Sequence, residues 1–389
     1  MSKVASITRA GGLIVNPQHA TASTTQYARG YISEGIAVTD GLVLYLDIAD
    51  YASWPGSRSL ATTWSDYASH QADYDVVGDD GVILLGTYTS WQGSFTSTTT
   101  ATGNHTVMFD YWSDNDNTAW SIDNDGVNND AYNTTLDADK KKKTFSKTVN
   151  LTSTGSSTMY MRPHATGSKV YVANYRFFKE AGWNDLSGNG KDATFSGSPV
   201  FNCTNDPPIH YLTFDGTDDK VDVGPLGTSG EFSESTISIW FNKAAQATMY
   251  GNLFDCNYLT SASNKGPRME VDSAGSIVRV YLGTDGGSYT SVSFGSLSND
   301  VWYNAVLTAA PNSTSQDLKA YTNGALVSSS TSSSSYVWDG DIGDLYLGVG
   351  FNSSRYFTGR IAVFQIYDRV LSAAEVKQNF NAERNRFGV

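Results

Sequence analysis

Residues 211–224, YLTFDGTDDKVDVG, constrain the fold of this chain more than any other stretch. Leu212 and Phe214 alternate with their neighbours at the two-residue period of a strand, and the same period resumes in KVDV. Asp215-Gly216, between the two runs, is a turn dipeptide, because glycine adopts the positive φ that a tight turn needs. The stretch therefore predicts a strand, an acidic turn and a second strand.

The composition excludes several classes of partner. Aromatic residues make up 13% and charged residues only 17% of the 389 residues, a mixture that suits short strands and turns better than long helices. The formal net charge of −13 disfavours contact with phosphate backbones and anionic lipid surfaces. No apolar run approaches the length of a membrane span. We therefore expect an all-β protein that binds neither nucleic acid nor membrane.

A strand pattern that begins early in the chain is interrupted and resumes much later. GLVLYLDIA (41–49) alternates as a strand does, and the phrase Trp64-Ser65-Asp66 that follows resembles Trp183-Asn184-Asp185. Residues 65–182 are too many for a loop, so we expect them to form an inserted domain. The predicted organisation is an N-terminal arm of residues 1–40, a discontinuous sandwich of residues 41–64 plus 183–389, and an inserted β domain of residues 65–182.

Eight phrases along this discontinuous sandwich carry a family resemblance. In chain order they are GLVLYLD, WNDLSGNGKDATF, LTFDGTDDKVDVG, STISIWF, WYNAVLT, AYTNGALVSS, LYLGVG and YFTGRIAVFQIYDRVLSAAEVKQNFN. The series resembles the laminin G-like, concanavalin A-like lectin family of bacterial surface and phage structural proteins. The resemblance implies a jelly-roll sandwich of two antiparallel sheets. The insert looks like the jelly-roll carbohydrate-binding modules attached to polysaccharide-degrading enzymes, which implies a second β-sandwich.

Two local signals lie in the last quarter of the chain. Thr322-Asn323-Gly324 predicts a hairpin turn. The sequence SAAE at 372–375 is a capping box, which predicts the start of a helix. Val376 and Phe380, four residues apart, give that helix a small apolar face.

Glycoside hydrolysis is the enzymatic activity that the sequence allows us to test. Some enzymes on the concanavalin-like fold carry three carboxylates along one strand, and Glu270 and Asp272 supply two of them. The third position falls on Ala274 or Gly275, so the acid/base partner of a retaining mechanism is missing. Motifs of other catalytic classes are absent from the sequence, and its five histidines are scattered. We therefore predict no catalytic residues and no enzymatic activity.

Calcium is the one cofactor that the sequence suggests. The loop Asp123-Asn124-Asp125-Gly126 resembles a fragment of a calcium-binding loop, although it lacks the downstream glutamate of an EF-hand. Asp215, Asp218 and Asp219 form a second group of hard oxygen ligands, of the kind jelly-roll lectins use for calcium. We take Asp123, Asp125 and Asp215 as candidate calcium ligands. The alternative is that these acids belong to ordinary solvated turns without an ion.

Aromatic side chains are the candidates for sugar binding. A pyranose ring stacks its apolar face on tryptophan or tyrosine, while nearby polar groups hydrogen-bond to the hydroxyls. Core packing is the alternative for each of them, and we expect it for Trp240 and Trp302, which lie in strongly alternating strands. The candidate sugar-binding residues are Trp91, Trp112, Trp120, Tyr132, Tyr281, Tyr289 and Tyr356.

The chain has two cysteines, Cys203 and Cys256. Their spacing from each other and from the histidines does not indicate a zinc site. They form either a single disulfide or two buried free thiols, and the sequence favours the thiols.

This layout favours a bacteriophage virion protein displayed on the particle surface, as a capsid decoration, head fibre or tail-associated protein. The N-terminal sequence MSKVASITRAGG lacks the apolar core of a secretion signal. Residues 1–40 are either a disordered tail or a segment that orders on virion proteins, while the sandwiches adhere to glycans. A bacterial adhesin or lectin and a glycan hydrolase are the alternatives. The sequence leaves open the glycan, the choice of head or tail, and whether the chain forms a homo-oligomer.

Overall fold

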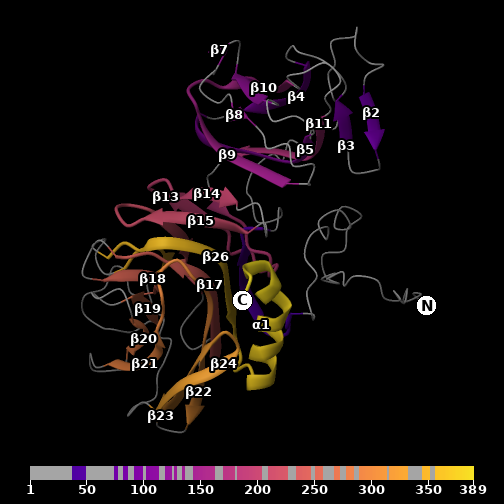
Figure 1. Ribbon diagram of the computed structural model, residues 1–389. Coiled ribbons are helices and arrows are strands. Elements are labelled where there is room, and N and C mark those ends of the chain that lie inside the picture. The colour runs from indigo at the N-terminus through magenta and orange to yellow at the C-terminus, as the bar shows by residue number, and fades with distance from the viewer. Residues whose placement is uncertain are drawn as a thin grey trace, which may run out of the picture. The chain divides into compact units, whose positions relative to one another are not determined.

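The structure is a computed structural model. It describes residues 37–49, 74–77, 82–85, 92–99, 102–113, 119–124, 127–128, 134–135, 143–162, 170–179, 182–203, 209–226, 234–246, 250–256, 267–271, 277–283, 289–312, 315–331, 344–350 and 355–389. These residues form strands and a single helix, which confirms the predicted all-β class (Figure 1). Within them, no helix has both the length and the apolar character needed to cross a membrane.

The chain divides into two compact units. The first contains residues 1–53, 183–199 and 212–389, and the second contains residues 54–182 and 200–211. The sequence prediction placed residues 200–211 in the resumed sandwich, whereas here they group with the inserted region. The exact domain boundaries stay a prediction.

The first unit is built on two antiparallel sheets, sheet A and sheet D. Within this unit sheet A has the order β15 (His210–Asp215), β26 (Thr358–Tyr367), β17 (Ser235–Lys243), β22 (Trp302–Asn312), β23 (Ser315–Thr322) and β24 (Ala325–Thr331), and β1 (Leu42–Asp47) also pairs with β26. The strand β14 (Val200–Cys203) groups with the second unit. Sheet D has the order β12 (Gly182–Trp183), β13 (Ala193–Ser196), β16 (Lys220–Gly224), β25 (Leu345–Leu347), β18 (Gly251–Asp255), β19 (Arg268–Val271), β20 (Ile277–Gly283) and β21 (Tyr289–Ser296).

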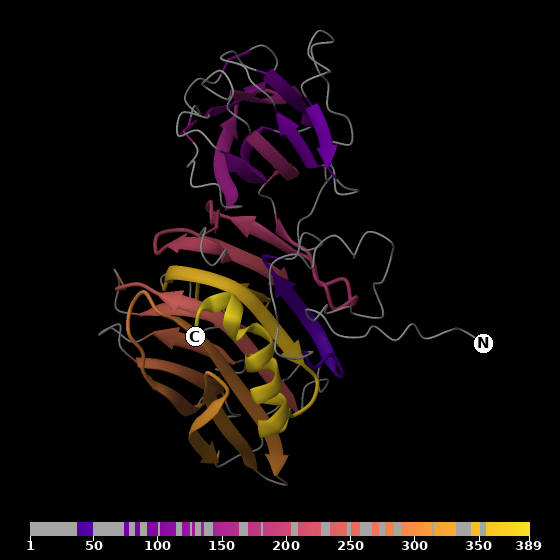
Figure 2. The ribbon, with the colours of Figure 1, turned by 45° about the vertical axis from the view of Figure 1, so that its right-hand side comes forward.

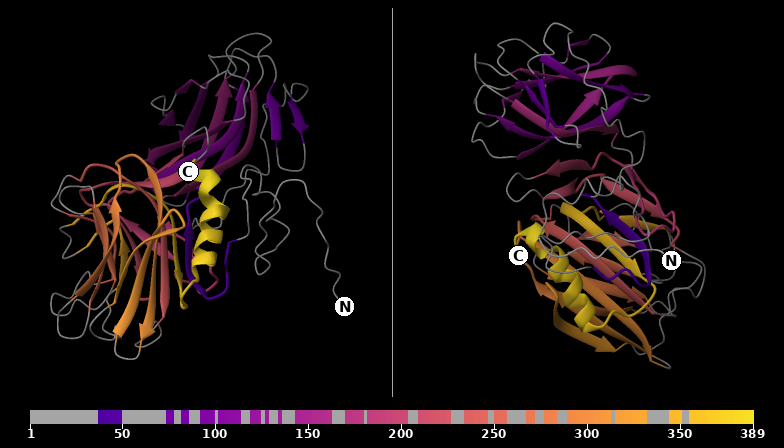
Figure 3. Two further views of the ribbon diagram at one scale, coloured as in Figure 1. Left: turned by 60° about the horizontal axis from the view of Figure 1, so that its bottom comes forward. Right: turned by 90° about the vertical axis from the view of Figure 1, so that its right-hand side faces the viewer.

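The first unit combines strands from both sides of the interruption. β1 pairs antiparallel with β26, with Leu44 opposite Ile366 (Figure 3). The loop after Trp183 then fastens β1 from its other side, because Asp185 Oδ1 accepts a hydrogen bond of 3.0 Å from the Tyr45 amide. The Asn189 amide group donates to the Val43 carbonyl at 3.2 Å. The WNDLSGNGK phrase therefore has a local structural role, which is to hold the first strand of the sandwich.

The acidic turn connects the two sheets. β15 lies in sheet A and β16 lies in sheet D, so residues 216–219 carry the chain from one layer of the sandwich to the other. Gly216 has φ 80°, as the turn dipeptide predicts. Leu212 and Phe214 are buried in the core, which confirms the strand face expected for them.

The helix α1 (Ala373–Phe387) covers the outer face of sheet A (Figure 2). Ser372 caps it, and both hydrogen bonds of the predicted capping box with Glu375 are present. The Phe387 ring stacks on Trp240 with centroids 4.1 Å apart and lies 5.0 Å from Trp302. Both faces of β17 are buried for this reason, one by the core and one by the helix. The two tryptophans are core residues, as expected.

Within the described residues, the hairpin turn and the state of one cysteine also agree with what the sequence predicts. Asn323 and Gly324, between β23 and β24, have φ 51° and 73°, values typical of a two-residue hairpin turn. Cys256 is a buried free thiol, and desolvation raises its pKa well above the ordinary value. The Cys203 side chain lies outside the described part of the chain.

The second unit is also formed from two sheets. Sheet B contains β4 (Gln92–Thr99), β10 (Gly155–Arg162), β6 (Ala119–Asn124), β7 (Val127–Asn128) and β8 (Thr134–Thr135). Sheet C contains β2 (Tyr74–Val77), β3 (Val82–Leu85), β11 (Val170–Lys179), β5 (Gly103–Ser113) and β9 (Lys143–Leu151). The predicted alternation in β5 is present, because Val107, Phe109 and Tyr111 are buried and Phe109 stacks on Phe145 at 5.0 Å.

Candidate functional site

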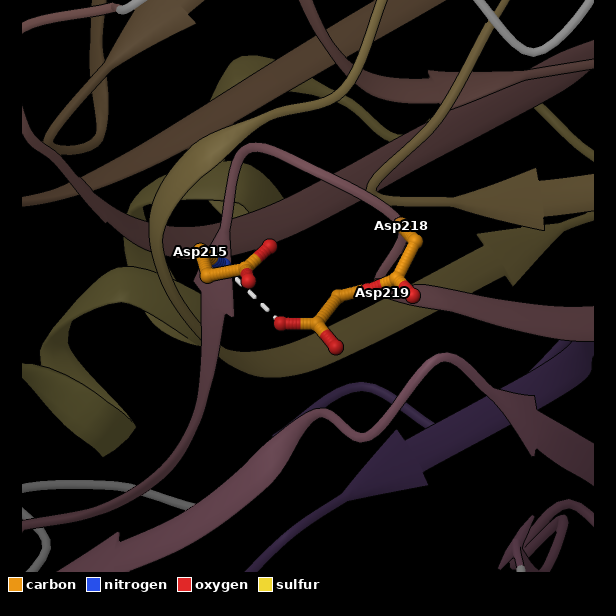
Figure 4. A group of neighbouring side chains, drawn as sticks. All are labelled: Asp215, Asp218 and Asp219. Atoms are coloured by element: carbon orange, nitrogen blue, oxygen red, sulfur yellow. Dashed lines mark hydrogen bonds between the residues drawn. The ribbon is translucent and has the colours of Figure 1, made fainter.

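The acidic turn gathers three carboxylates (Figure 4). Oxygens of Asp215, Asp218 and Asp219 lie within 4.8 Å of one another. Asp215 and Asp218 are exposed, whereas Asp219 is buried. Burial raises the pKa of Asp219, and the neighbouring charges of Asp215 and Asp218 act in the same direction.

The buried acid of this turn is a structural acceptor. Asp219 Oδ1 accepts a hydrogen bond of 2.8 Å from the Ser198 amide, and its Oδ2 accepts one of 2.9 Å from the Asp215 amide. Asp215 Oδ1 accepts one of 2.7 Å from the Thr217 amide. A Cβ on Gly197 would lie 2.5 Å from the Asp218 carbonyl oxygen, so the two loops pack backbone to backbone.

Calcium fits this group only in part. The three carboxylates supply part of the six to eight oxygens that calcium takes. Both oxygens of Asp219 already accept backbone N–H groups, so the turn holds its shape through its own hydrogen bonds. Asp123 lies in β6 opposite Asn128, and its side chain, like Asp125, lies outside the described part of the chain. The calcium sites therefore stay a prediction.

A second group of polar residues lies on sheet D, and the strand register shows which way it faces. The Phe254 ring meets Phe364 of β26 edge to face, with centroids 5.5 Å apart, so Phe254 points toward sheet A. Its register partners Met269 and Leu347 share that apolar face. Because successive side chains of a strand alternate, the next position on each strand faces away from the core.

Those outward positions are polar across four adjacent strands. Asp255 pairs with Arg268 on one side and with Tyr346 on the other, and Tyr346 pairs with Asp222. Glu270, between two buried apolar residues of β19, pairs with Asn252. We call this group the polar face of sheet D: Asp222, Asn252, Asp255, Arg268, Glu270 and Tyr346.

Arg355 covers the centre of the polar face. Its Nη1 donates a hydrogen bond of 3.0 Å to Glu270 Oε2, and Arg268 Nε lies 3.9 Å from the same oxygen. The Arg355 guanidinium carbon lies 4.7 Å from the centre of the Tyr250 ring. The Glu270 side chain is 4% exposed and that of Arg355 is 25% exposed, so the arginine reaches solvent while the carboxylate does not. The pair thus offers a solvent-accessible guanidinium held in one orientation between a ring and a carboxylate.

The buried end of the polar face contains an acceptor without a partner. Asn252 Nδ2 donates to Asp255 Oδ2 at 3.1 Å, but Asn252 Oδ1 is buried and has no hydrogen-bond partner among the described residues. A Cβ on Gly350 would lie 2.4 Å from Asn252 Cγ, so the amide packs directly against backbone. The backbone amides of Asn252 and Gly350 both donate to the Arg355 carbonyl at 3.2 Å. The loop that carries Arg355 is thereby fixed to β18.

Aromatic rings and a second cation border the face. Tyr356 is partly buried and packs against Tyr346 and Val349. The Lys220 amine lies 5.2 Å from the centre of the Tyr346 ring. With Tyr250, three tyrosines therefore surround the charged groups, which is the combination that sugar-binding surfaces use.

The structure brings one of the predicted sugar-binding residues, Tyr356, to this face. For four others it describes the backbone alone: Trp112 pairs with Tyr171, Trp120 with Met161, Tyr281 with Arg268 and Tyr289 with Gly283. Trp91 and Tyr132 lie outside the described residues. The roles of all these residues in sugar binding stay predictions.

Sequence reasoning missed most of the polar face. Its signal was present, because polar Asn252 and Asp255 interrupt the buried strand GNLFD, and charged residues alternate with apolar ones in RMEV. No sequence pattern pointed to Arg355, because it lies in a loop and only tertiary contacts bring it to this face.

The described contacts of the Glu270 carboxylate are with positively charged side chains. Its register partners are Asn252 and Arg279, and its carboxylate contacts two arginines. A retaining mechanism needs a second carboxyl about 5 Å away. Asp272, the other acid of the sequence pattern, lies outside the described residues.

Comparisons with known proteins gave one matching family model and several similar solved structures. The family model Laminin_G_3, described as the Concanavalin A-like lectin/glucanases superfamily, matches residues 215–377. Among solved structures, the binding domain of Paraclostridial Mosquitocidal Protein 1 is 18% identical, with a TM-score of 0.42 and coverage of 52% of this chain and 50% of that one. The receptor binding domain of botulinum neurotoxin D is 17% identical, with a TM-score of 0.40 and coverage of 52% and 50%.

A third solved structure is a domain of an enzyme. Domain 4 of AbnA, a GH43 extracellular arabinanase from Geobacillus stearothermophilus, in complex with arabinotriose, is 16% identical, with a TM-score of 0.38 and coverage of 52% of this chain and 97% of that one. The match spans about half the length of the toxin binding domains. No curated protein matches this chain. Residues 215–377 are thus similar to the Concanavalin A-like lectin/glucanases superfamily, which confirms the resemblance carried by the ordered strand phrases.

Proposed function

We propose that this chain is a non-catalytic glycan-binding protein whose binding surface is the solvent-accessible rim of the polar face of sheet D, around Arg355. The observation that carries the proposal is the Tyr250–Arg355–Glu270 arrangement, in which an accessible guanidinium is held over a tyrosine ring and against a buried carboxylate. The similarity of residues 215–377 to a lectin/glucanase superfamily supports it.

The chemistry of the face suits hydroxyl recognition. Sugar hydroxyls both donate and accept hydrogen bonds, and the face offers donors on Arg355 and Lys220 and an acceptor on Asp222. The borders supplied by Tyr250 and Tyr356 give the apolar face of a sugar ring a place to stack. Charges of both signs are present, so the expected ligand is a neutral glycan.

Glycan-array binding followed by titration calorimetry of the best ligand tests the proposal. Arg355→Ala removes the central guanidinium, and we expect at least about a tenfold loss of affinity, or about 1.4 kcal/mol. Lys377→Ala is the matched control, because Lys377 also lies over an aromatic ring, that of Phe380 at 4.8 Å, but on α1. Equal losses in the two variants, or affinity unchanged in Arg355→Ala, would contradict the proposal.

We also propose that the chain is displayed on a bacteriophage virion, with the N-terminal residues as its attachment segment. The described end of that segment is held firmly: the Val38 amide donates to Asn379 Oδ1 at 2.7 Å, and the Tyr367 hydroxyl donates to the Val38 carbonyl at 3.0 Å. Arg369 Nε also donates to the Asp40 carbonyl at 3.0 Å. Such contacts would transmit a load from an attachment point to the sandwich.

Co-expression with the virion proteins encoded beside its gene tests this display. The full chain is expected to sediment with particles, and a chain lacking residues 1–36 is expected to remain in the supernatant. This deletion leaves residues 37–40 and their contacts in place. If the full chain binds glycans but never sediments with particles, the bacterial adhesin alternative replaces the virion assignment.

A glycan hydrolase remains a distinct outcome. Release of reducing sugar from a bound glycan that disappears in Glu270→Gln would overturn the non-catalytic assignment.

A further inference from the structure

The main chain around Arg355 is fastened at two levels. The Phe357 amide donates to the Gly348 carbonyl at 2.9 Å, and the Gly350 amide donates to the Arg355 carbonyl at 3.2 Å. The same Arg355 carbonyl accepts a second hydrogen bond of 3.2 Å, from the Asn252 amide of β18. The main chain of Arg355 is therefore tied both to the residues that follow β25 and to sheet D.

Glycine is required at position 350 for space, because its backbone does not have a positive φ. A Cβ there would lie 2.2 Å from Asn252 Nδ2 and 2.7 Å from Asp255 Oδ2. Asn252 is 0% exposed and Asp255 is 1% exposed, and their side chains hydrogen-bond to each other at 3.1 Å, so neither can turn aside into solvent. A side chain at position 350 would therefore lift the main chain that is tied to Arg355.

The buried Asn252–Asp255 pair lowers stability where apolar packing would not. Asn252 Oδ1 has no hydrogen-bond partner among the described residues, and an unpaired buried acceptor is unfavourable. Both residues lie in the strand GNLFD, whose five residues are all buried. Unfavourable local features of this kind occur where a precise geometry serves function. The pair thus indicates a requirement on position rather than on stability.

We propose that Gly350 and Asn252 are positioning residues for glycan binding, which hold the Arg355 main chain at a fixed place over the polar face. This inference rests on the function proposed above for that face. Both residues are buried, so they act through Arg355 and not by touching a ligand. The arginine is then fixed at both ends, because Glu270 holds its guanidinium at 3.0 Å, and it loses little conformational freedom when a glycan binds.

A double-mutant cycle, with the best glycan from the array as the ligand, tests the positioning role. Gly350→Ala is expected to lose most of the roughly tenfold affinity that Arg355→Ala loses. Added to a chain that already carries Arg355→Ala, the same substitution is expected to change affinity by less than about twofold, because it acts through that arginine. Gly324→Ala is the matched control: a Cβ there would lie 2.9 Å from Lys377 Cδ, away from the polar face. It is expected to lower Tm and leave affinity unchanged.

The outcomes separate this inference from the proposed function. If Arg355→Ala weakens binding and Gly350→Ala does not, the positioning role is overturned while glycan binding at this face stands. Full additivity of the two losses would also overturn it, because a general destabilisation does not depend on Arg355. Affinity unchanged in Arg355→Ala would contradict the proposed function, and the positioning role with it.

Hydrogen exchange in the parent chain gives a test that needs no variant to fold. The amides of Asn252 and Gly350, which both donate to the Arg355 carbonyl, are expected to exchange slowly before any glycan is added and to change little afterwards. Fast exchange of both amides in the free protein that becomes slow only with the glycan would overturn the inference, because the arginine would then be positioned by the ligand.

Discussion

The acidic turn and the polar face of sheet D each contain a buried carboxylate, Asp219 and Glu270, but the two acids are held by different kinds of partner. The turn takes Asp215, Asp218 and Asp219 from five consecutive residues, and its buried acid accepts backbone amides. The polar face takes Glu270 and Arg355 from positions 85 residues apart, and its groups contact side chains and a tyrosine ring. The acid buried in the turn serves to shape the chain, whereas the charges assembled from distant strands form the surface that we propose as a ligand site.

The largest effect is expected from Asp219→Ala in the turn. The substitution leaves the partly buried amides of Ser198 and Asp215 without their acceptor; a fully buried unpaired donor costs about 1–3 kcal/mol and a partly buried one less, so the loss of stability is roughly 2–4 kcal/mol. Denaturant unfolding measures this loss. Asp218→Ala, at an exposed position, is the control and is expected to cost less than about 0.5 kcal/mol. Similar losses in both variants would remove the structural role assigned to Asp219.

A third charged cluster also brings together residues that are far apart in the sequence, and it shows how burial changes a pKa there. Arg386 on α1 contacts Asp47 of β1 at 2.9 Å and Glu383 at 3.5 Å, and the Tyr45 hydroxyl donates to Asp47 at 3.1 Å. Desolvation, followed by the charge of Asp47, raises the pKa of Glu383 from 4.5 to about 7 against the opposing effect of Arg386. The folded state therefore binds the Glu383 proton more tightly than the unfolded state does.

The stability contributed by that proton is complete below pH 4.5 and is lost as pH rises toward 7. Glu383→Gln is expected to remove this pH dependence, on the order of 1–3 kcal/mol, and to leave the variant more stable than the parent at pH 8. Denaturant unfolding of both proteins across this pH range is the measurement. A parent profile that is flat, or that rises with pH in this window, would contradict the assignment.

On the polar face, we expect Glu270→Gln to affect binding more than stability. The amide keeps the shape of the carboxylate but loses the charge that orients Arg355, so glycan affinity is expected to fall about tenfold, or about 1.4 kcal/mol. The loss of stability is expected to be about 1 kcal/mol. Calorimetric titration with the glycan and thermal unfolding measure the two effects. The reverse order, with large destabilisation and unchanged affinity, would make this face structural like the turn.

The smallest effect concerns calcium at the turn. If the exposed acids hold an ion, calcium at a few times its dissociation constant stabilises the parent by about 1 kcal/mol and raises Tm by about 2–4 °C. Asp218→Asn is expected to abolish this shift while leaving the calcium-free Tm near that of the parent. Thermal unfolding with calcium and with EDTA makes the comparison. An identical shift in parent and variant would place any calcium elsewhere.

More of the fold than of the candidate site could be predicted from the sequence, because strand patterns are local. Alternation, turn glycines and the capping box at Ser372 are each written within a few residues, and each is present in the structure. The polar face depends on register across four strands and on a loop, and a single sequence does not specify which residues become neighbours. Tyr356 was found because aromatic residues are candidates anywhere, whereas Arg355 could not be distinguished from other surface arginines.

The sequence by itself determined the all-β class, the acidic turn, the helix start and the pairing of an early strand with late ones. These follow from two-residue periodicity and turn chemistry, which act over short distances along the chain. Only the tertiary structure decided that β15 and β16 enter different sheets, that α1 buries Trp240, and that Glu270 lies beside Arg355. The reason is that these contacts depend on how whole sheets and the helix pack, and the energy of that packing is shared among residues far apart in the chain.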